Sequence, residues 1–208
     1  MSRSRASSNR WRQRQDRDPY VERAIREGWR SRAVFKLAQI DQRERLLKRG
    51  SIVVDLGAAP GGWSQFAAGK LGPAGRVVAI DLLEMDPIES VEFMQADFMS
   101  DAALAELLQL LGGAEVDLVM SDMAPNISGN KAVDLPRHYA LAEAALQFAT
   151  EVLKPGGDFL VKLFQGEGFS EFVADVRSRF ETVKLIKPKA SRPASREIYL
   201  LARNYRMV

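Results

Sequence analysis

Two hydrophobic patterns alternate along the chain. In short runs nearly every position is apolar and often β-branched, whereas in longer segments apolar residues recur every three or four positions. The first pattern is typical of strands buried in a sheet and the second of helices with one apolar face. The first pattern predicts seven strands: SIVVDL (51–56), GRVVAIDL (75–82), VEFMQADF (91–98), VDLVMSDM (116–123), DFLVKLF (158–164), TVKLIK (182–187) and REIYLLA (196–202).

Predicted helices fall between most of these strands. They are WSQFAAGKL (63–71), DAALAELLQLL (101–111) and PRHYALAEAALQFATEVL (136–153), after two short helices between about Pro19 and Leu47. The segment LKPGG (153–157) predicts a turn before the fifth strand. The loop KPKASRPAS (187–195) is too short for a helical crossover, so the last two strands should pair antiparallel.

This alternation predicts the fold class. Strands and helices in turn favour an α/β fold, a single-domain, doubly wound, mostly parallel seven-stranded sheet with a C-terminal antiparallel hairpin. We find no internal repeat and no second core in the 208 residues. We expect a flexible basic N-terminal tail over residues 1–18 and one domain over 19–208. Ligands of such sheets bind at the carboxyl ends of the strands, near the point where the strand order reverses.

Composition excludes several classes of protein. No run approaches the roughly 20 apolar residues of a membrane span, and the start lacks the apolar stretch of a secretory signal. The Arg- and Ser-rich start leaves an organellar transit peptide open. The chain has no cysteine and a single histidine, His138, so we expect no disulfide, no metal site and a cytoplasmic location.

Charge is distributed unevenly. Residues 1–36 carry eleven Lys and Arg against four Asp and Glu, and residues 184–208 carry seven against one. Because the whole chain has a net charge of +3, residues 37–183 sum to −10. Basic ends with interleaved aromatic residues favour a nucleic-acid partner. The alternative is that the ends are solvated charges that keep the protein soluble.

The turn after the first predicted strand, DLGAAPGGWSQ, indicates the ligand. It lacks the Lys and hydroxyl of a phosphate-binding loop and also the GxGxxG of a dinucleotide site. Pro60 removes an N–H donor, and Asp55 would repel a phosphate. That carboxylate suits a cationic or zwitterionic ligand, which Gly57, Gly61 and Gly62 would let approach the backbone. S-adenosylmethionine, with its ammonium and sulfonium, fits.

Later strands end in further acids. Asp81 lies at the offset at which an acid binds ribose hydroxyls in doubly wound nucleotide sites. Asp97 is placed to accept from an adenine amino group, and Asp122 ends the fourth strand. Each acid alone is more typical of a turn or a helix cap. Lys162 lies in an apolar strand, where a buried lysine is unusual. The alternative is that its side chain extends from a sheet edge to solvent and has no function.

These motifs carry a resemblance that covers nearly the whole chain. The chain resembles the FtsJ/RrmJ family of RNA ribose 2′-O-methyltransferases. The segments that carry the resemblance are SRAVFKL, VVDLGAAPGGWSQ, MSDMAPN, VDLPR, VLKPGG, VKLFQGEGF and SREIYL. The resemblance implies a Rossmann-like methyltransferase fold and S-adenosylmethionine as methyl donor. It places the family's K-D-K-E tetrad on Lys36, Asp122, Lys162 and Glu197, and its donor contacts on Gly61, Trp63, Asp81, Asp97 and Asp122.

The resemblance also implies a substrate and a mechanism. The resemblance is strongest to members that act on ribosomal RNA. We therefore expect the methyl acceptor to be a uridine 2′-hydroxyl of large-subunit (23S) ribosomal RNA, within the large ribosomal subunit. We also expect a monomeric enzyme. A tRNA anticodon loop is the alternative substrate. We expect Lys162 to accept the proton of the hydroxyl, once burial and the charge of Lys36 lower the pKa of Lys162. We expect the other three tetrad residues to position the reacting groups and to stabilise them electrostatically.

Two other classes of function stay open on sequence grounds. A nucleotide-dependent oxidoreductase would share the sheet and the acid after the second strand, but it would leave the tetrad unexplained. A non-catalytic RNA-binding protein of ribosome assembly would account for the basic ends equally well.

Overall fold

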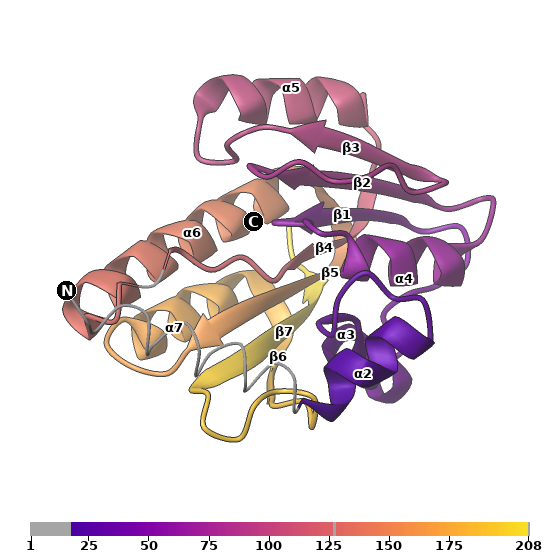
Figure 1. Cartoon of the computed structure of the whole chain (residues 1–208). Helices are drawn as coiled ribbons and strands as arrows, with labels where there is room; N and C mark the ends of the chain where they lie inside the picture. The colour runs from indigo at the N-terminus through magenta and orange to yellow at the C-terminus, as the bar shows by residue number, and fades with distance from the viewer. Residues whose placement is uncertain (1–17, 127, 208) are drawn as a thin grey trace.

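The computed structural model describes residues 18–126 and 128–207. Figure 1 shows one sheet with helices on both sides. The helices are α2 (Pro19–Arg26), α3 (Val34–Glu44), α4 (Gly62–Leu71), α5 (Asp101–Leu111), α6 (Lys131–Val152) and α7 (Phe169–Arg179). The strands are β1 (Ile52–Leu56), β2 (Arg76–Asp81), β3 (Val91–Gln95), β4 (Val116–Ser121), β5 (Leu153–Phe164), β6 (Phe180–Ile186) and β7 (Glu197–Tyr205).

The strand order confirms the predicted sheet. It runs β3-β2-β1-β4-β5-β7-β6, with β1 to β5 parallel. Strand β7 lies between β5 and β6 and pairs antiparallel with both. The order reverses between β1 and β4, so ligands should bind beside the ends of these two strands.

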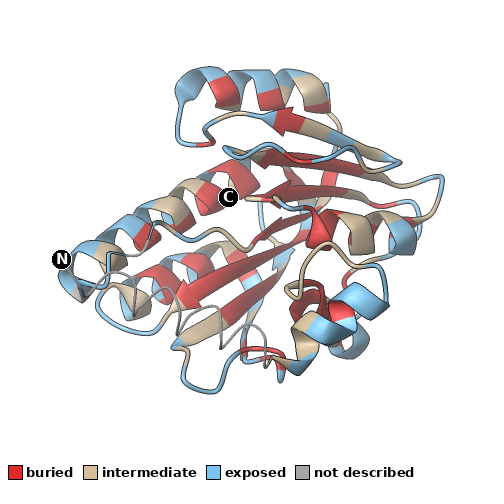
Figure 2. Cartoon of the chain, viewed as in Figure 1, coloured by how far each residue is buried: buried red, intermediate tan, exposed pale blue. Residues whose placement is uncertain are grey.

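Alternate residues of each strand face different helices. Val54 and Val119 pack in a core cluster with residues of α5, α6 and α7, whereas Val53, Leu118 and Leu160 pack with residues of α3 and α4. Figure 2 shows that the central strands are buried along most of their length. Since side chains alternate along a strand, Lys162 lies on the same face as Leu160, toward α3.

Three local predictions differ from the structure. Helix α6 begins at Lys131, before Pro136, because the Asn130 side chain caps it by accepting from Ala132 N at 3.1 Å. Helix α7 was not among the predicted helices, although Phe172, Val173 and Val176 form its buried face. The LKPGG segment is not a separate turn but the irregular start of β5, where the register with β4 shifts.

The basic ends of the chain approach each other at α2. Asp18 caps α2 by accepting from Tyr20 N at 3.1 Å, and its carboxylate lies 2.9 Å from Arg32 Nη1 and 3.7 Å from Arg192 Nε. The rest of the predicted tail, residues 1–17, lies outside the described residues. Among those described, no helix combines the length and apolar character needed to cross a membrane.

Candidate active site

The predicted strand-end acids meet at one edge of the sheet. Asp81, Asp97 and Asp122 all line a cavity of about 410 Å³, together with Gly57. This volume lies within the roughly 300–1,000 Å³ of small-molecule sites. Asp55 instead lines a second cavity of about 150 Å³, which shares Gly57, Ala59 and Asp122 with the first. The two cavities therefore adjoin at the Gly-rich turn.

The turn needs its glycines. Gly57 has φ +77°, and a Cβ there would overlap the Met123 side chain. Gly61 has φ +103°, and a Cβ would lie 2.7 Å from Ile88 Cδ1. Main-chain hydrogen bonds fix the turn against β2, and one of them runs from Gly57 N to Ile80 O at 2.9 Å. Glycine is therefore required at both positions by the left-handed backbone and by the close approach of Met123 and Ile88.

Asp55 is a buried carboxylate with one side-chain partner. It is 1% exposed, and Ser64 Oγ donates to its Oδ2 at 2.6 Å. Burial raises the pKa of Asp55 to about 7, with the Ser64 bond opposing and the charges of Asp122 and Asp81 adding to the rise. A nearby cation would stabilise the ionised form, as the sequence interpretation requires.

Asp81 and Asp97 also shape the backbone. Asp81 accepts from Ala59 N at 2.9 Å and from Leu83 N at 2.8 Å, one bond to each carboxylate oxygen. Asp97 is exposed and accepts from Met99 N at 3.0 Å. Both oxygens of Asp81 retain a lone pair, since a carboxylate offers about four acceptor positions. The turn-forming role and the ligand role are therefore compatible.

Trp63 is almost fully buried in the core and also belongs to the lining of the smaller cavity. The residue is only 3% exposed, and its indole Nε1 donates a hydrogen bond to Ala33 O at 2.9 Å. The ring lies 5.7 Å from that of Tyr199.

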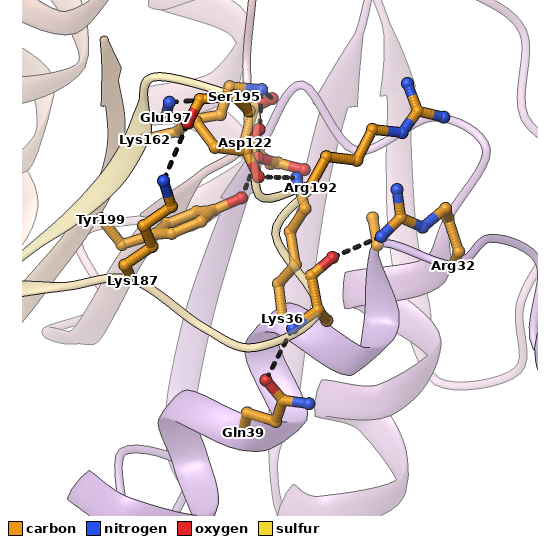
Figure 3. A network of polar contacts seen from close by, with 12 residues as sticks. Arg32, Lys36, Gln39, Asp122, Lys162, Lys187, Arg192, Ser195, Glu197 and Tyr199 are labelled. Carbon is orange, nitrogen blue, oxygen red and sulfur yellow. Dashed lines mark hydrogen bonds and ion pairs between the residues drawn. The ribbon is translucent and has the colours of Figure 1, made fainter. Parts of the chain in front are cut away.

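The four tetrad residues form two ion pairs (Figure 3). Lys36 Nζ lies 2.9 Å from Glu197 Oε1, and Lys162 Nζ lies 3.1 Å from Asp122 Oδ1. Lys162 also donates to the main-chain oxygen of Asp122 at 2.6 Å. The four side chains are between 8% and 17% exposed. Helix α3, the ends of β4 and β5, and the start of β7 bring them together.

Tyr199 connects the two pairs, and the sequence interpretation missed it. It is fully buried, its hydroxyl donates to Asp122 Oδ1 at 2.6 Å, and Lys36 Nζ lies 5.6 Å from its ring centre. It lies opposite Lys162 in the antiparallel ladder. Strand alternation was the signal that could have found it, because Glu197 and Tyr199 are two residues apart on one strand.

Electrostatics keep Asp122 ionised. Burial alone would raise the pKa of its carboxyl, but Lys162, Lys36 and the Tyr199 hydrogen bond together lower it below its ordinary value. Burial, with the charges of Asp122 and Glu197, raises the pKa of Tyr199, so its hydroxyl remains a donor. The arrangement can thus hold and orient an ammonium beside the larger cavity.

Comparison with known proteins places this site in a family. The sequence profile of the FtsJ-like methyltransferase family matches residues 29–205. The chain belongs to this family. Two relatives from Pseudomonas fluorescens strains Pf-5 and Pf0-1, each named ribosomal RNA large subunit methyltransferase E, are 53% and 50% identical to it. Each match covers 206 residues, which is 99% of this chain and 98% of the relative.

Two solved structures share the fold of this chain. A crystal structure from Plasmodium falciparum, described as a ribosomal RNA methyltransferase, superimposes with a TM-score of 0.77 at 29% identity. It matches 85% of this chain and 98% of its own. A Clostridium thermocellum structure shares the fold at 21% identity, with a TM-score of 0.57 and 81% and 96% coverage.

No cluster suited to a metal ion occurs in the described part of the chain. Within residues 18–126 and 128–207, no three or more His, Cys, Asp or Glu side chains lie close enough together to hold one.

Proposed function

We propose that this FtsJ-like methyltransferase transfers a methyl group from S-adenosylmethionine to a ribose 2′-hydroxyl, that of a uridine in large-subunit (23S) ribosomal RNA. One observation carries the proposal: the buried Lys162–Asp122 pair shares Asp122 with the cavity suited to the donor. The names of the two Pseudomonas relatives support the RNA class. Because that RNA is made and assembled inside the cell, the proposal implies a cytoplasmic enzyme, which we take to act as a monomer.

The described residues fit the donor. Asp81 offers lone pairs to ribose hydroxyls, and Asp97 offers an exposed carboxylate to the adenine amino group. Asp55 and Gly57 line the smaller cavity, where the donor's cationic end would approach, and Gly61 lies in the same turn. When bound, S-adenosylmethionine supplies an electrophilic methyl group on its sulfonium sulfur.

Lys162 acts on the ribose hydroxyl in this proposal. A ribose hydroxyl is a poor nucleophile at neutral pH, so a group must accept its proton as the oxygen attacks. The two contacts of Nζ with Asp122 hold Lys162 in place for this step.

The other three tetrad residues position the reacting groups and stabilise them electrostatically. Asp122 orients Lys162, while Glu197 holds Lys36 within reach of the ribose. Much of the acceleration would come from the alignment of hydroxyl, methyl and sulfur, which binding secures in advance.

Substitution of Lys162 tests the proton-acceptor role. Lys162→Ala should lower the methyl-transfer rate by at least about 10²-fold, the scale of a general base, while donor and RNA still bind. Lys162→Arg should be nearly as slow, because a guanidinium does not deprotonate at accessible pH. Lys184→Ala is the control, since that lysine also pairs with a buried carboxylate, Glu44, but lies away from the site. Near-normal turnover by the Arg variant would leave Lys162 an electrostatic role only.

RNA mapping separates the candidate functions. We expect 2′-O-methyl groups on ribosomal RNA to be lost from cells that lack the protein. Loss on a tRNA anticodon loop would instead select the alternative substrate. If purified protein transfers no labelled methyl group to any RNA, including assembled large subunits, the non-catalytic assembly role would replace the enzyme.

A further inference from the structure

The loop between β2 and β3 forms one wall of the larger cavity. Leu82 and Leu83, its first residues after Asp81, line that cavity and are 65% and 66% exposed. Residues 82–90 contain no helix or strand, and connecting segments of this kind are more mobile than the elements they connect. The shape of this wall therefore depends on the contacts that hold the loop.

Arg30, from the segment between α2 and α3, holds the far half of this loop. Its Nη1 donates to Asp86 O at 2.5 Å, and its Nη2 donates to Pro87 O at 2.7 Å. Nη1 also lies 3.5 Å from Pro60 O in the Gly-rich turn. All three acceptors are main-chain oxygens. Because a guanidinium presents its N–H donors in a rigid fork, Arg30 joins the loop to the turn.

The main chain of Arg30 is fixed as well. Gln65 of α4 accepts from Arg30 N at 3.2 Å, and its Nε2 donates to Gly28 O at 3.1 Å. The Arg30 side chain therefore extends from a segment that α4 holds in place. Arg30 connects three parts of the chain, which are α4, the Gly-rich turn and the β2–β3 loop.

The loop and the turn also pack against each other where Arg30 joins them. Met85 is buried in one apolar cluster with Ala58 of the turn, and Ile88 packs against the same cluster. A Cβ on Gly61 would lie 2.8 Å from Met85 Sδ and 3.2 Å from Arg30 Cδ. Without the guanidinium, the loop would keep these apolar contacts but lose the hydrogen bonds that fix its main chain.

We propose that Arg30 is a positioning residue for the methyl donor. It acts through the β2–β3 loop and keeps Leu82 and Leu83 where they receive the adenosine. Arg30 itself lines neither cavity, so it needs no contact with the donor. A loop that is ordered before binding lowers the entropic cost of binding. The inference rests on the proposed function, since it requires S-adenosylmethionine in the larger cavity.

Calorimetric titration of the full chain measures the effect. Arg30→Ala should weaken S-adenosylmethionine binding by about tenfold, the scale of one hydrogen bond to a charged group. Methylthioadenosine, which lacks the amino-acid end, should weaken by the same factor because the loop faces the adenosine. Arg30→Lys should recover part of the affinity, since an ammonium still donates to a carbonyl but lacks the fork. The binding stoichiometry should stay constant, whereas partial misfolding would lower it.

Arg76→Ala is the matched control. Arg76 also donates to two main-chain oxygens, those of Leu110 and Leu111, and it pairs with Glu92. It lines neither cavity, so its removal should change donor affinity by less than about twofold.

Hydrogen exchange without ligand shows whether Arg30 acts through the loop. The Leu83 amide donates to Asp81 Oδ1 at 2.8 Å, so the wall contains a protected amide whose exchange reports local opening. In Arg30→Ala, residues 82–90 should exchange faster, while α5 should keep its protection.

The outcomes distinguish the two proposals. If Arg30→Ala binds both ligands as tightly as the unmodified protein, or weakens only S-adenosylmethionine, Arg30 does not position the adenosine wall and this inference is wrong. Unchanged exchange of residues 82–90 would contradict it as well. If the unmodified protein binds neither ligand, the donor assignment itself fails, and the proposed function and this inference fail with it.

Discussion

Asp81 shows how one side chain serves both the fold and the site. It holds the Gly-rich turn through Ala59 N while its remaining lone pairs face the larger cavity. Asp81→Ala should therefore weaken donor binding by roughly 1.5–3 kcal/mol, the scale of a hydrogen bond to a charged group. Calorimetric titration with S-adenosylmethionine measures this, with Asp86→Ala as control because Asp86 is exposed on the following loop. Unchanged affinity in Asp81→Ala would remove this residue from the site.

Asp55 makes stability depend on pH. Its folded-state pKa of about 7 exceeds the ordinary 3.8, so between these values the folded protein binds more protons than the unfolded chain. The contribution of Asp55 to the free energy of unfolding should therefore fall as pH rises from about 4 to 7, by at most about 4 kcal/mol at 1.4 kcal/mol per pH unit. His138, whose pKa burial lowers to about 4, contributes with the opposite sign, so the difference between the protein and Asp55→Asn is the informative quantity. Urea unfolding at pH 5 and pH 8, without ligand, measures the change. In Asp55→Asn this contribution should vanish, and an equal pH dependence in both proteins would contradict the assignment.

At the scale of elements, the β1–α4 turn packs against the loop after β4. Gly57→Ala forces a left-handed backbone on a residue with a side chain and displaces Met123, the neighbour of Asp122. We expect a loss of about 1–3 kcal/mol in unfolding free energy, together with weaker donor binding. Thermal and urea unfolding measure the first effect. Gly69→Ala is the control, because Gly69 lies within α4 with no atom within 4 Å of the added Cβ, so it should stabilise by about 0.5–1 kcal/mol.

At the scale of the whole molecule, charge separates RNA binding from donor binding. Residues 3–17 contain six arginines and one acid, whereas the lining residues of the larger cavity all belong to the acidic middle, residues 37–183. Removing residues 1–17 keeps the Asp18 cap and should weaken RNA binding. Each lost phosphate contact should reduce the slope of log affinity against log salt by about 0.7. RNA titrations across a salt series measure this, with donor affinity expected to stay constant. Identical slopes would favour the interpretation that the tail only promotes solubility.

Local patterning was enough for most of the fold. Strand and helix periods predicted all seven strands, the antiparallel end and the acids at the strand tips, because each of these depends on residues close together in sequence. Where chemistry at an element's end decided the outcome, the prediction missed: Asn130 starts α6 before Pro136, and the bulged LKPGG joins β5. The family motifs supplied the tetrad residues and suggested their pairing, but not the Tyr199 side chain that connects the two pairs.

Tertiary structure decided the contacts on which the chemistry depends. Lys36 and Glu197 meet across 161 positions of sequence, and Tyr199 contacts both ion pairs only because β7 inserts between β5 and β6. Trp63 packs in the core, and Ser31, whose hydroxyl has no hydrogen-bond partner within residues 18–126 and 128–207, lies beside Gly62. No local pattern encodes such pairings, since they depend on how separate elements pack and on which buried polar atoms packing leaves without a partner.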